Sequence, residues 1–257
     1  MAAVDPWQLQ ADPEWALAVV VAAVDYALVV RTFGRRGEPT PLWRRACFAG
    51  GLALVAIALL SPLEHIALTS LLSAHLLQNV MLADWAPPLL VLGLTPAMMR
   101  AAERRAWVRA ATAPPVALAV WLAAWYVLHI PPIYSYALDH RWALGLEHLA
   151  FLGSGLAFWW AVISPGRMRA QARLFFLFAA FIAAAPVAFL LAFTRPLYEF
   201  YEQTPKLWGL SPIEDQQIGA IGMAIEQAII LFAACSLAFM QWLDEDEAPR
   251  RPVGFPT

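Results

Sequence analysis

The chain has 257 residues, of which 61% are hydrophobic and only 14% are charged, and its mean hydropathy is +0.60. Soluble domains carry about a quarter charged residues, so this composition excludes a soluble globular domain and predicts an integral membrane protein. The formal net charge of −2 also argues against a nucleic-acid partner.

Seven apolar stretches follow one another along the chain, each close to the length of about 20 residues that a helix needs to cross the hydrocarbon layer. No hydrophilic block between them is large enough to form a second domain. We therefore predict an all-α, polytopic bundle of seven transmembrane helices, with residues 1–257 forming a single integral membrane domain. The predicted spans are approximately 15–30, 46–60, 69–94, 115–129, 146–163, 175–193 and 216–242.

The basic residues are distributed unevenly between alternate loops. Fourteen of the 17 Lys and Arg residues fall in the loops after the first, third and fifth spans and in the tail, which contains Arg250 and Arg251. Only Arg141, Arg195 and Lys206 fall on the other side. Because cytoplasmic loops are enriched in Lys and Arg, we expect the N-terminus outside and the C-terminus in the cytoplasm. The expected location is the cell (inner or plasma) membrane.

With this orientation, all five histidines lie toward the outer side. His65 is expected in an outer loop, His129 at the end of the fourth span, His140 in the next loop and His148 at the start of the fifth span. His75 is the one embedded histidine. Imidazole is the commonest protein metal ligand, and polar groups at membrane depth are costly enough to suggest a function. The cluster therefore points to metal or cofactor chemistry at one membrane face.

The third span has the densest polar pattern. His75, Gln78 and Asn79 are spaced i, i+3 and i+4, so they share one helical face, and this face should point into the bundle rather than into lipid. Asp84 lies about half a turn around the helix and deeper, which predicts a different contact for its carboxylate.

Two proline pairs predict interruptions. Pro87–Pro88 should kink or break the third helix in its inner half. Pro131–Pro132 should end the fourth helix just after His129 and leave a short turn that contains Tyr134 and Tyr136.

Acidic residues begin the fifth and seventh spans. Glu147 precedes His148 and is expected to orient a neighbouring imidazole, as the outer partners of metal ligands do. Asp215 is expected to be favoured by the dipole of its own helix. Gly219 and Gly222 should let another helix approach closely. Gln216, Met223, Glu226 and Gln227 lie on the same or the adjacent stripe of this helix.

Several segments together resemble a known family, the CtaG-like cytochrome c oxidase assembly factors, which are seven-helix proteins associated with caa-type oxidases. The resemblance extends over most of the chain from about Arg31 onward, and the ordered set is more specific than any one motif. The matching segments are SAHLLQNVML, APPLLVLGLTP, HIPPIYSYAL, LEHLAFLGSGLAFWW, PLYEFY and SPIEDQQIGAIGM.

The resemblance implies a non-enzymatic assembly or maturation factor for a haem–copper cytochrome c oxidase, which handles copper at the outer membrane face. The implied partners are the cytochrome c oxidase subunits, the lipid bilayer and other copper chaperones. The implied copper ligands are His75, His129 and His148, with Met223 as a weaker one. The accompanying polar pocket comprises Gln78, Asn79, Glu147, Asp215, Gln216, Gln217 and Glu226.

The chain departs from the family pattern in three places, which makes it a divergent member. The usual His-x-x-x-His of the third helix has Asn79 as its second residue. The further His that usually precedes the Glu-His pair by one turn is replaced by Leu144 or a neighbour. The usual Trp-x-Pro-Gly after Met223 is replaced by residues 224–227. These changes should preserve the fold and leave the metal role with fewer ligands.

Two other classes remain open on the sequence. A haem-binding membrane cytochrome would use two axial His, but a transmembrane electron carrier needs His in both halves, so haem is not expected. A proton-coupled carrier would use Asp25, Asp84 and Glu226, the acidic residues within the apolar spans. Cys47 and Cys235 form no CxxC pair, which argues against a cysteine-based copper relay.

Overall fold

The computed structural model describes residues 5–9 and 12–247, so Arg250 and Arg251 lie outside the described residues. In these two ranges all regular structure is helical, which confirms the predicted all-α class. The elements are α1 (Pro13–Arg35), α2 (Leu42–Leu60), α3 (Pro62–Thr69), α4 (Leu72–Val80), the π-helical turn η1 (Met81–Trp85), α5 (Ala86–Leu92), α6 (Pro96–Ala102), α7 (Ala106–Ala111), α8 (Pro114–Leu128), α9 (Pro131–Asp139), α10 (Arg141–Ile163), α11 (Ala170–Phe193), α12 (Glu199–Gln203), the 3-10 turn η2 (Leu207–Gly209) and α13 (Pro212–Glu247).

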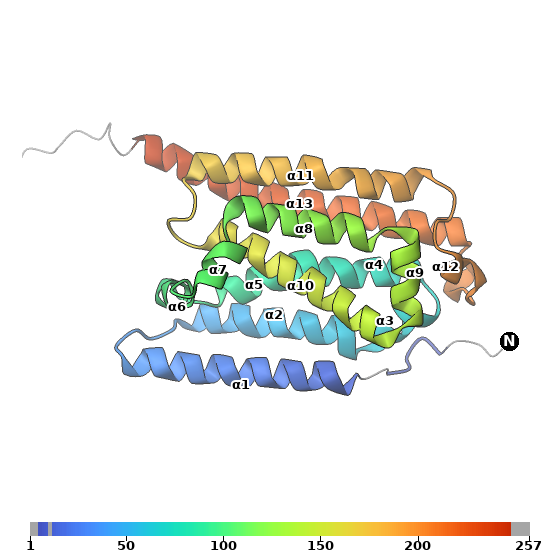
Figure 1. Cartoon of the computed structure of the whole chain (residues 1–257), viewed down its shortest axis with the longest axis horizontal. Helices are drawn as coiled ribbons and strands as arrows, with labels where there is room; N and C mark the ends of the chain where they lie inside the picture. The colour runs from blue at the N-terminus through green and yellow to red at the C-terminus, as the bar shows by residue number, and fades with distance from the viewer. Residues whose placement is uncertain (1–4, 10–11, 248–257) are drawn as a thin grey trace, which may run out of the picture.

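The long helices run side by side along the long axis of the molecule (Figure 1). Within the described ranges, five single helices are long and apolar enough to cross a membrane, and two bent pairs bring the number to as many as seven. A helix occupies each of the seven stretches in which the sequence predicts a span.

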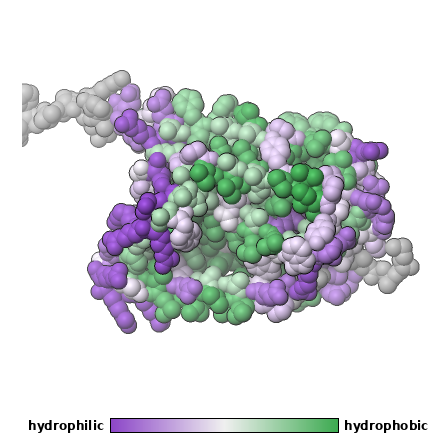
Figure 2. Space-filling view, viewed as in Figure 1, coloured by the Kyte–Doolittle hydropathy of each residue, from purple (hydrophilic) through white to green (hydrophobic). Residues whose placement is uncertain are grey.

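The two ends of the bundle differ in what they carry. The short helices α3, α9 and α12 lie at one end, here called the α9 end, and α6 and α7 lie at the other, the α6 end (Figure 1). The loops α1–α2 and α10–α11, which are rich in Arg, also lie at the α6 end. Figure 2 shows hydrophilic residues gathered at both ends and hydrophobic residues between them, the pattern expected of a protein with two water-facing ends and a lipid-facing middle.

Helix α1 lies at the edge of the bundle beside α2 (Figure 1). None of its residues is buried, and Val20, Val24 and Leu28 are among its exposed apolar side chains. An apolar helix of this kind is stable only when lipid or a partner covers it.

The third span continues through Pro87–Pro88 without a break in the helix. Pro87 has no N–H, so the Ala83 carbonyl four residues earlier has no helical donor there. The chain accommodates this with the wider π turn of η1, and α5 then continues the helix. The sharp bend, of 110°, comes later, between Leu92 and Pro96. The predicted position of the break was therefore wrong.

Gly155 explains how α10 packs against this turn. A Cβ atom on Gly155 would lie 2.2 Å from the Ala83 carbonyl oxygen, so a side chain there would collide with the backbone of η1. In α13, Gly219 has the predicted role, because its Cβ would lie 2.6 Å from Leu76 of α4. The same prediction for Gly222 was wrong, since no atom lies within 4 Å of its Cβ position.

The segment after His129 also differs from its prediction. Instead of a short turn, Pro131 begins the helix α9, bent by 77° from α8. Proline is favoured at the first position of a helix because its φ is already helical and its missing N–H would have no partner there. The Pro131–Pro132 pair therefore ends one helix and starts the next.

Candidate functional site

His75 lies at the centre of a buried polar cluster at the α9 end and is fully buried. Its Nδ1 atom is 3.0 Å from the Tyr201 hydroxyl, and this hydroxyl donates a hydrogen bond of 2.6 Å to the Ala67 carbonyl. The Tyr201 hydroxyl has one proton, and that proton is donated to the Ala67 carbonyl. The hydroxyl oxygen must therefore accept a hydrogen bond from His75 Nδ1–H. This fixes the ring so that Nε2 points to the other side.

The Nε2 atom of His75 faces Glu147 of α10. The distance from Nε2 to Glu147 Oε1 is 3.3 Å, and both side chains are almost completely buried. Asn79, one turn after His75, donates from Nδ2 to the same carboxylate oxygen at 3.4 Å. A ring lone pair and a carboxylate oxygen repel each other, so the gap between them must hold a proton or a metal cation.

His129 and His148, like His75, each have a buried Nε2 atom that is not in a hydrogen bond. The Nδ1 atom of His129 lies 2.6 Å from the Trp125 carbonyl oxygen, which can only accept, so Nδ1 carries the proton and Nε2 has the lone pair. The Nε2 atoms of both His129 and His148 are buried and have no hydrogen-bond partner. The His148 ring centroid is 6.1 Å from that of His75, and Tyr134 contacts the rings of both His75 and His129.

The donor set has the right chemistry for a metal but is spread out. Neutral imidazole nitrogens suit copper, and an Nδ1–H donated to a fixed oxygen is the usual outer support of a metal-binding histidine. Nevertheless, among the described residues no group of three or more His, Cys, Asp or Glu side chains is arranged to hold a metal ion. In this arrangement a metal would contact His75 and Glu147, and a third ligand would require a side chain to move.

Three tyrosines close the cluster, and the sequence did not identify them as site residues. Tyr134, Tyr198 and Tyr201 are all buried, and the rings of Tyr134 and Tyr198 are 4.2 Å apart. Tyr198 donates its hydroxyl proton to the His129 carbonyl at 3.0 Å. Burial raises the pKa of Tyr198 and Tyr201 above the ordinary value, so both remain neutral hydroxyls. Tyr198 and Tyr201 lie in the PLYEFY segment, one of the segments that resemble the family, and this segment was the sequence feature that could have identified them.

Gln78 holds a second carboxyl group in place. Its Nε2 atom donates to the Ala58 carbonyl at 2.6 Å and to Glu64 Oε2, which ties α4 to α2 and α3. Burial raises the pKa of Glu64 to about 7, and the hydrogen bond from Gln78 opposes part of that rise. The sequence did not mark Glu64 as a site residue either.

Asp215 lies in the first turn of α13, as expected, and its carboxylate in addition caps the helix α4. Its two carboxylate oxygens accept from the backbone N–H groups of Leu72 and Ser73 at 2.8 and 3.0 Å, at the start of α4. It also accepts from the Ser73 hydroxyl and forms an ion pair of 3.2 Å with Lys206. Asp215 therefore fastens α13 to α4, with its acceptor sites occupied by protein donors.

The neighbouring glutamines are structural as well. Gln216 accepts from Leu197 N–H at 2.9 Å and donates to the Leu191 carbonyl at 2.8 Å, and Gln217 donates to the Ala192 carbonyl. These bonds hold the end of α11 against α13. Met223 lies in the apolar core, and Glu226 lies with Asp84 deeper in the bundle.

The remaining histidines differ from each other. His65, expected in a solvated loop, lies on α3 and is buried, so that prediction was wrong. His140 is exposed as expected, and its ring stacks on Tyr136 with the centroids 4.0 Å apart. His140 therefore serves as a surface control for experiments on His75.

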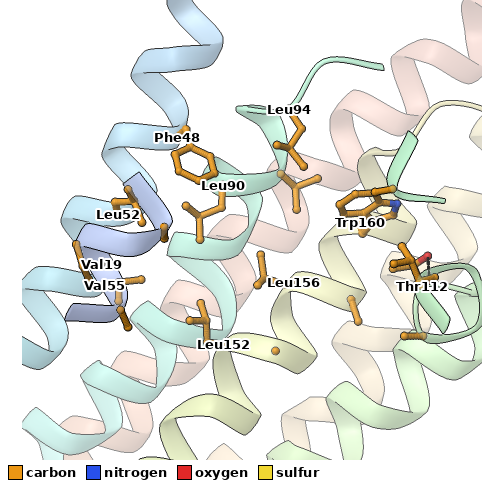
Figure 3. A pocket seen from close by; sticks show the side chains of 18 of the residues that line it. Val19, Phe48, Leu52, Val55, Leu90, Leu94, Thr112, Leu152, Leu156 and Trp160 are labelled. Atoms are coloured by element: carbon orange, nitrogen blue, oxygen red, sulfur yellow. Dashed lines mark hydrogen bonds between the residues drawn. The ribbon is translucent and has the colours of Figure 1, made fainter. Parts of the chain in front are cut away.

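A large apolar cavity lies elsewhere. It has a volume of about 600 Å³ and is lined by side chains such as Val19 of α1, Phe48 and Leu52 of α2, and Leu152 and Leu156 of α10 (Figure 3). None of the predicted site residues lines it. Its lining gives no ligand chemistry for a metal.

The fold and the polar cluster define a helical membrane protein with a buried His–Glu–Tyr centre near one end. The chain matches the model of the family described as cytochrome c oxidase caa3 assembly factor (Caa3_CtaG) over residues 24–245. It therefore belongs to that family, as the sequence motifs indicated. A search of curated proteins and a search of solved structures each found no match.

Proposed function

We propose that this protein assists the assembly of a caa3-type cytochrome c oxidase by binding copper as cargo at the His75–Glu147 contact and passing it on. In this proposal the role is non-catalytic, and the receiving partner is an oxidase subunit or another copper chaperone. His129 and His148 supply the further nitrogens when side chains rearrange around the metal.

The observation that carries the proposal is the position of the histidine nitrogens. His75 and His129 each commit Nδ1–H to a protein oxygen, so each has Nε2 free to accept a proton or a metal. The His75 Nε2 faces a buried carboxylate at 3.3 Å. When the metal enters this gap it replaces the proton that otherwise joins the two groups, so binding should release a proton.

The substitution of Asn79 for the family's second histidine fits a cargo site. Asn79 points its amide N–H₂ group at Glu147 and therefore holds the carboxylate without adding a metal ligand. A site with few ligands holds copper less tightly than a complete chelate does. The weaker binding favours transfer of the copper to the oxidase.

We further propose that the α9 end faces outward in the cell membrane. The described basic residues of the first, third and fifth predicted loops belong to segments at the α6 end, and cytoplasmic loops are enriched in such residues. The His75 cluster then lies on the side from which copper is delivered to an outward-facing oxidase centre.

A deletion strain tests this function. Cells that lack the protein should lose the assembled caa3-type oxidase, and the wild-type gene should restore it. His75→Ala and Glu147→Gln should fail to restore it at low copper and should recover partly when copper is added. His140→Ala, a change at an exposed histidine, should restore the oxidase fully.

Two results would overturn the proposal. Full oxidase activity in the deletion strain would remove the assembly role altogether. Full restoration by His75→Ala, with the variant present in normal amount in the membrane, would separate the assembly role from copper at this site.

A further inference from the structure

Two acidic side chains meet in the apolar middle of the bundle, away from the histidine cluster. Asp84 lies on the π turn η1 and is 1% exposed, and Glu226 lies on α13. Their carboxyl groups interact with each other. Neither belongs to the proposed copper contact.

Two indole N–H groups accompany the pair. Trp85 donates from Nε1 to Glu226 Oε2 at 2.6 Å. Trp121 of α8 is 1% exposed, its Nε1 has no other partner, and it interacts with the Asp84 carboxyl. The polar atoms of η1, α8 and α13 thus converge on one place.

The pair lacks donors for its facing oxygens. Both carboxylate oxygens of Asp84 and the Oε1 atom of Glu226 are buried without a normal hydrogen bond from an N–H or O–H group. Two carboxylates that face each other in apolar surroundings repel strongly, and neither can be solvated by lipid. A proton placed between them removes one charge and supplies the missing hydrogen bond.

We propose that Asp84 and Glu226 form a proton-binding site that holds one shared proton, as a carboxylic acid hydrogen-bonded to a carboxylate. Trp85 and Trp121 donate to the remaining oxygens and stabilise the single negative charge. Loss of the shared proton leaves two like charges and drives α13 away from η1. The copper contact is not needed for this site, so the two proposals can fail separately.

Few groups act on the Asp84–Glu226 pair. The groups that act on it are its own two carboxyls and the two indoles. Helices α2, α4, α5 and α10 pack around η1, and α4 and α11 pack on α13. The charged and titratable side chains that the helices around the site carry are Arg44, Arg45 and Cys47 on α2, His75 on α4, Tyr126 on α8, Arg141, Glu147 and His148 on α10, Arg173 on α11, and Glu214, Asp215, Cys235, Asp244, Glu245 and Asp246 on α13.

Infrared difference spectroscopy of the full chain in lipid nanodiscs tests the proposal. The wild type at neutral pH should show a protonated carboxyl band that shifts in D₂O and disappears at alkaline pH. Asp84→Asn and Glu226→Gln should each change this band, and the double variant should keep only the part that Glu64, another buried acid with a raised pKa, contributes. Asp25→Asn, which alters an exposed acid on α1, should leave it unchanged.

A second measurement guards against misfolded variants. The melting temperature of the wild type should fall as the pH rises through loss of the shared proton. Glu226→Gln keeps the shape of the side chain but cannot become negatively charged, so the melting temperature of this variant should depend less on pH. Two outcomes overturn the proposal. In the first, the wild-type and double-variant spectra agree at every pH. In the second, the wild-type protein shows no protonated band from the pair, and Na⁺ stabilises the protein whereas a bulky organic cation does not. The second outcome would assign the pair to a metal cation instead.

Discussion

The polar cluster at the α9 end and the apolar cavity beside α1 are opposites. The cluster concentrates His75, Glu147 and Tyr201 in a packed interior. The cavity offers about 600 Å³ of space between largely apolar walls. The open space and the polar cluster therefore lie in different parts of the molecule, and none of the residues proposed to bind copper lines this cavity.

Helix α10 connects these two regions. Glu147 and His148 near its start belong to the cluster, Gly155 packs against η1, and Leu152 and Leu156 line the cavity. Substitutions along this one helix and its partners can therefore test whether the two regions differ in the way proposed.

Removal of the Asp215 carboxylate should cause the largest loss of stability. Asp215→Ala leaves the Leu72 and Ser73 N–H groups and the Lys206 ammonium without their acceptor. Breaking such a buried network costs on the order of 3 kcal/mol or more. Thermal unfolding in detergent should show the loss, and Glu214→Ala at the exposed neighbouring position should cause a much smaller one. Equal losses would contradict the capping role.

A methyl group at Gly155 should disrupt the junction of α10 and η1. The new Cβ would lie 2.2 Å from the Ala83 carbonyl oxygen, so one helix must shift. We expect Gly155→Ala to lower the unfolding free energy by about 2–3 kcal/mol. Gly153→Ala is the matched control, because no atom lies within 4 Å of its Cβ position. A stable Gly155→Ala variant would show that the close contact is not needed.

Glu64 should make the cluster sensitive to pH. Its pKa is raised to about 7 in the folded protein from an ordinary value near 4.5, so the folded state holds the proton more tightly than the unfolded state. Stability should therefore be full below the ordinary value, fall as the pH rises through about 7, and then level off. The drop should be about 3 kcal/mol. Melting temperatures against pH should show the drop, and Glu64→Gln should remove the part of it that is centred near pH 7 while leaving the part that Glu226→Gln removes.

The cavity should tolerate change. Ala157 of α10 contributes to its wall, and Ala157→Val adds two methyl groups toward the open space. We expect a stability change within about 0.5 kcal/mol and no effect on oxidase assembly. Failed oxidase assembly in a stable Ala157→Val variant would show that the cavity has a function. It would then contradict the proposal that only the polar cluster acts in assembly.

Local patterns in the sequence predicted the helical class and the shared face of His75, Gln78 and Asn79, whereas the grouping of His75 with Glu147 came only from the family resemblance. Apolar length marks a membrane helix, and the i, i+3, i+4 spacing of His75, Gln78 and Asn79 correctly placed all three on a buried face. The contacts of Tyr201 and Glu64 could not be predicted in the same way. They depend on how short helices fold over the end of the bundle, which no periodicity encodes.

The errors have a common physical cause. The cap that Asp215 forms on α4 was missed, because Leu72 and Ser73, more than 140 positions away in the chain, lie next to Asp215 only in the folded protein. Pro87–Pro88 does not break the helix, because the π turn η1 accommodates the missing N–H and Gly155 of α10 leaves room for that turn. In each case a partner from a distant segment decided the outcome.

Copper binding by the purified protein tests the central claim most directly. Cuprous copper retained against a competing chelator should be lost in His75→Ala, unchanged in His140→Ala, and weakened about 10–100-fold in Tyr201→Phe, which removes the oxygen that supports His75 Nδ1. Asn79→His, which adds an imidazole one turn from His75, should bind more tightly than the wild type. A wild type that retains no copper, or a His75→Ala variant that retains as much as the wild type, would contradict the account.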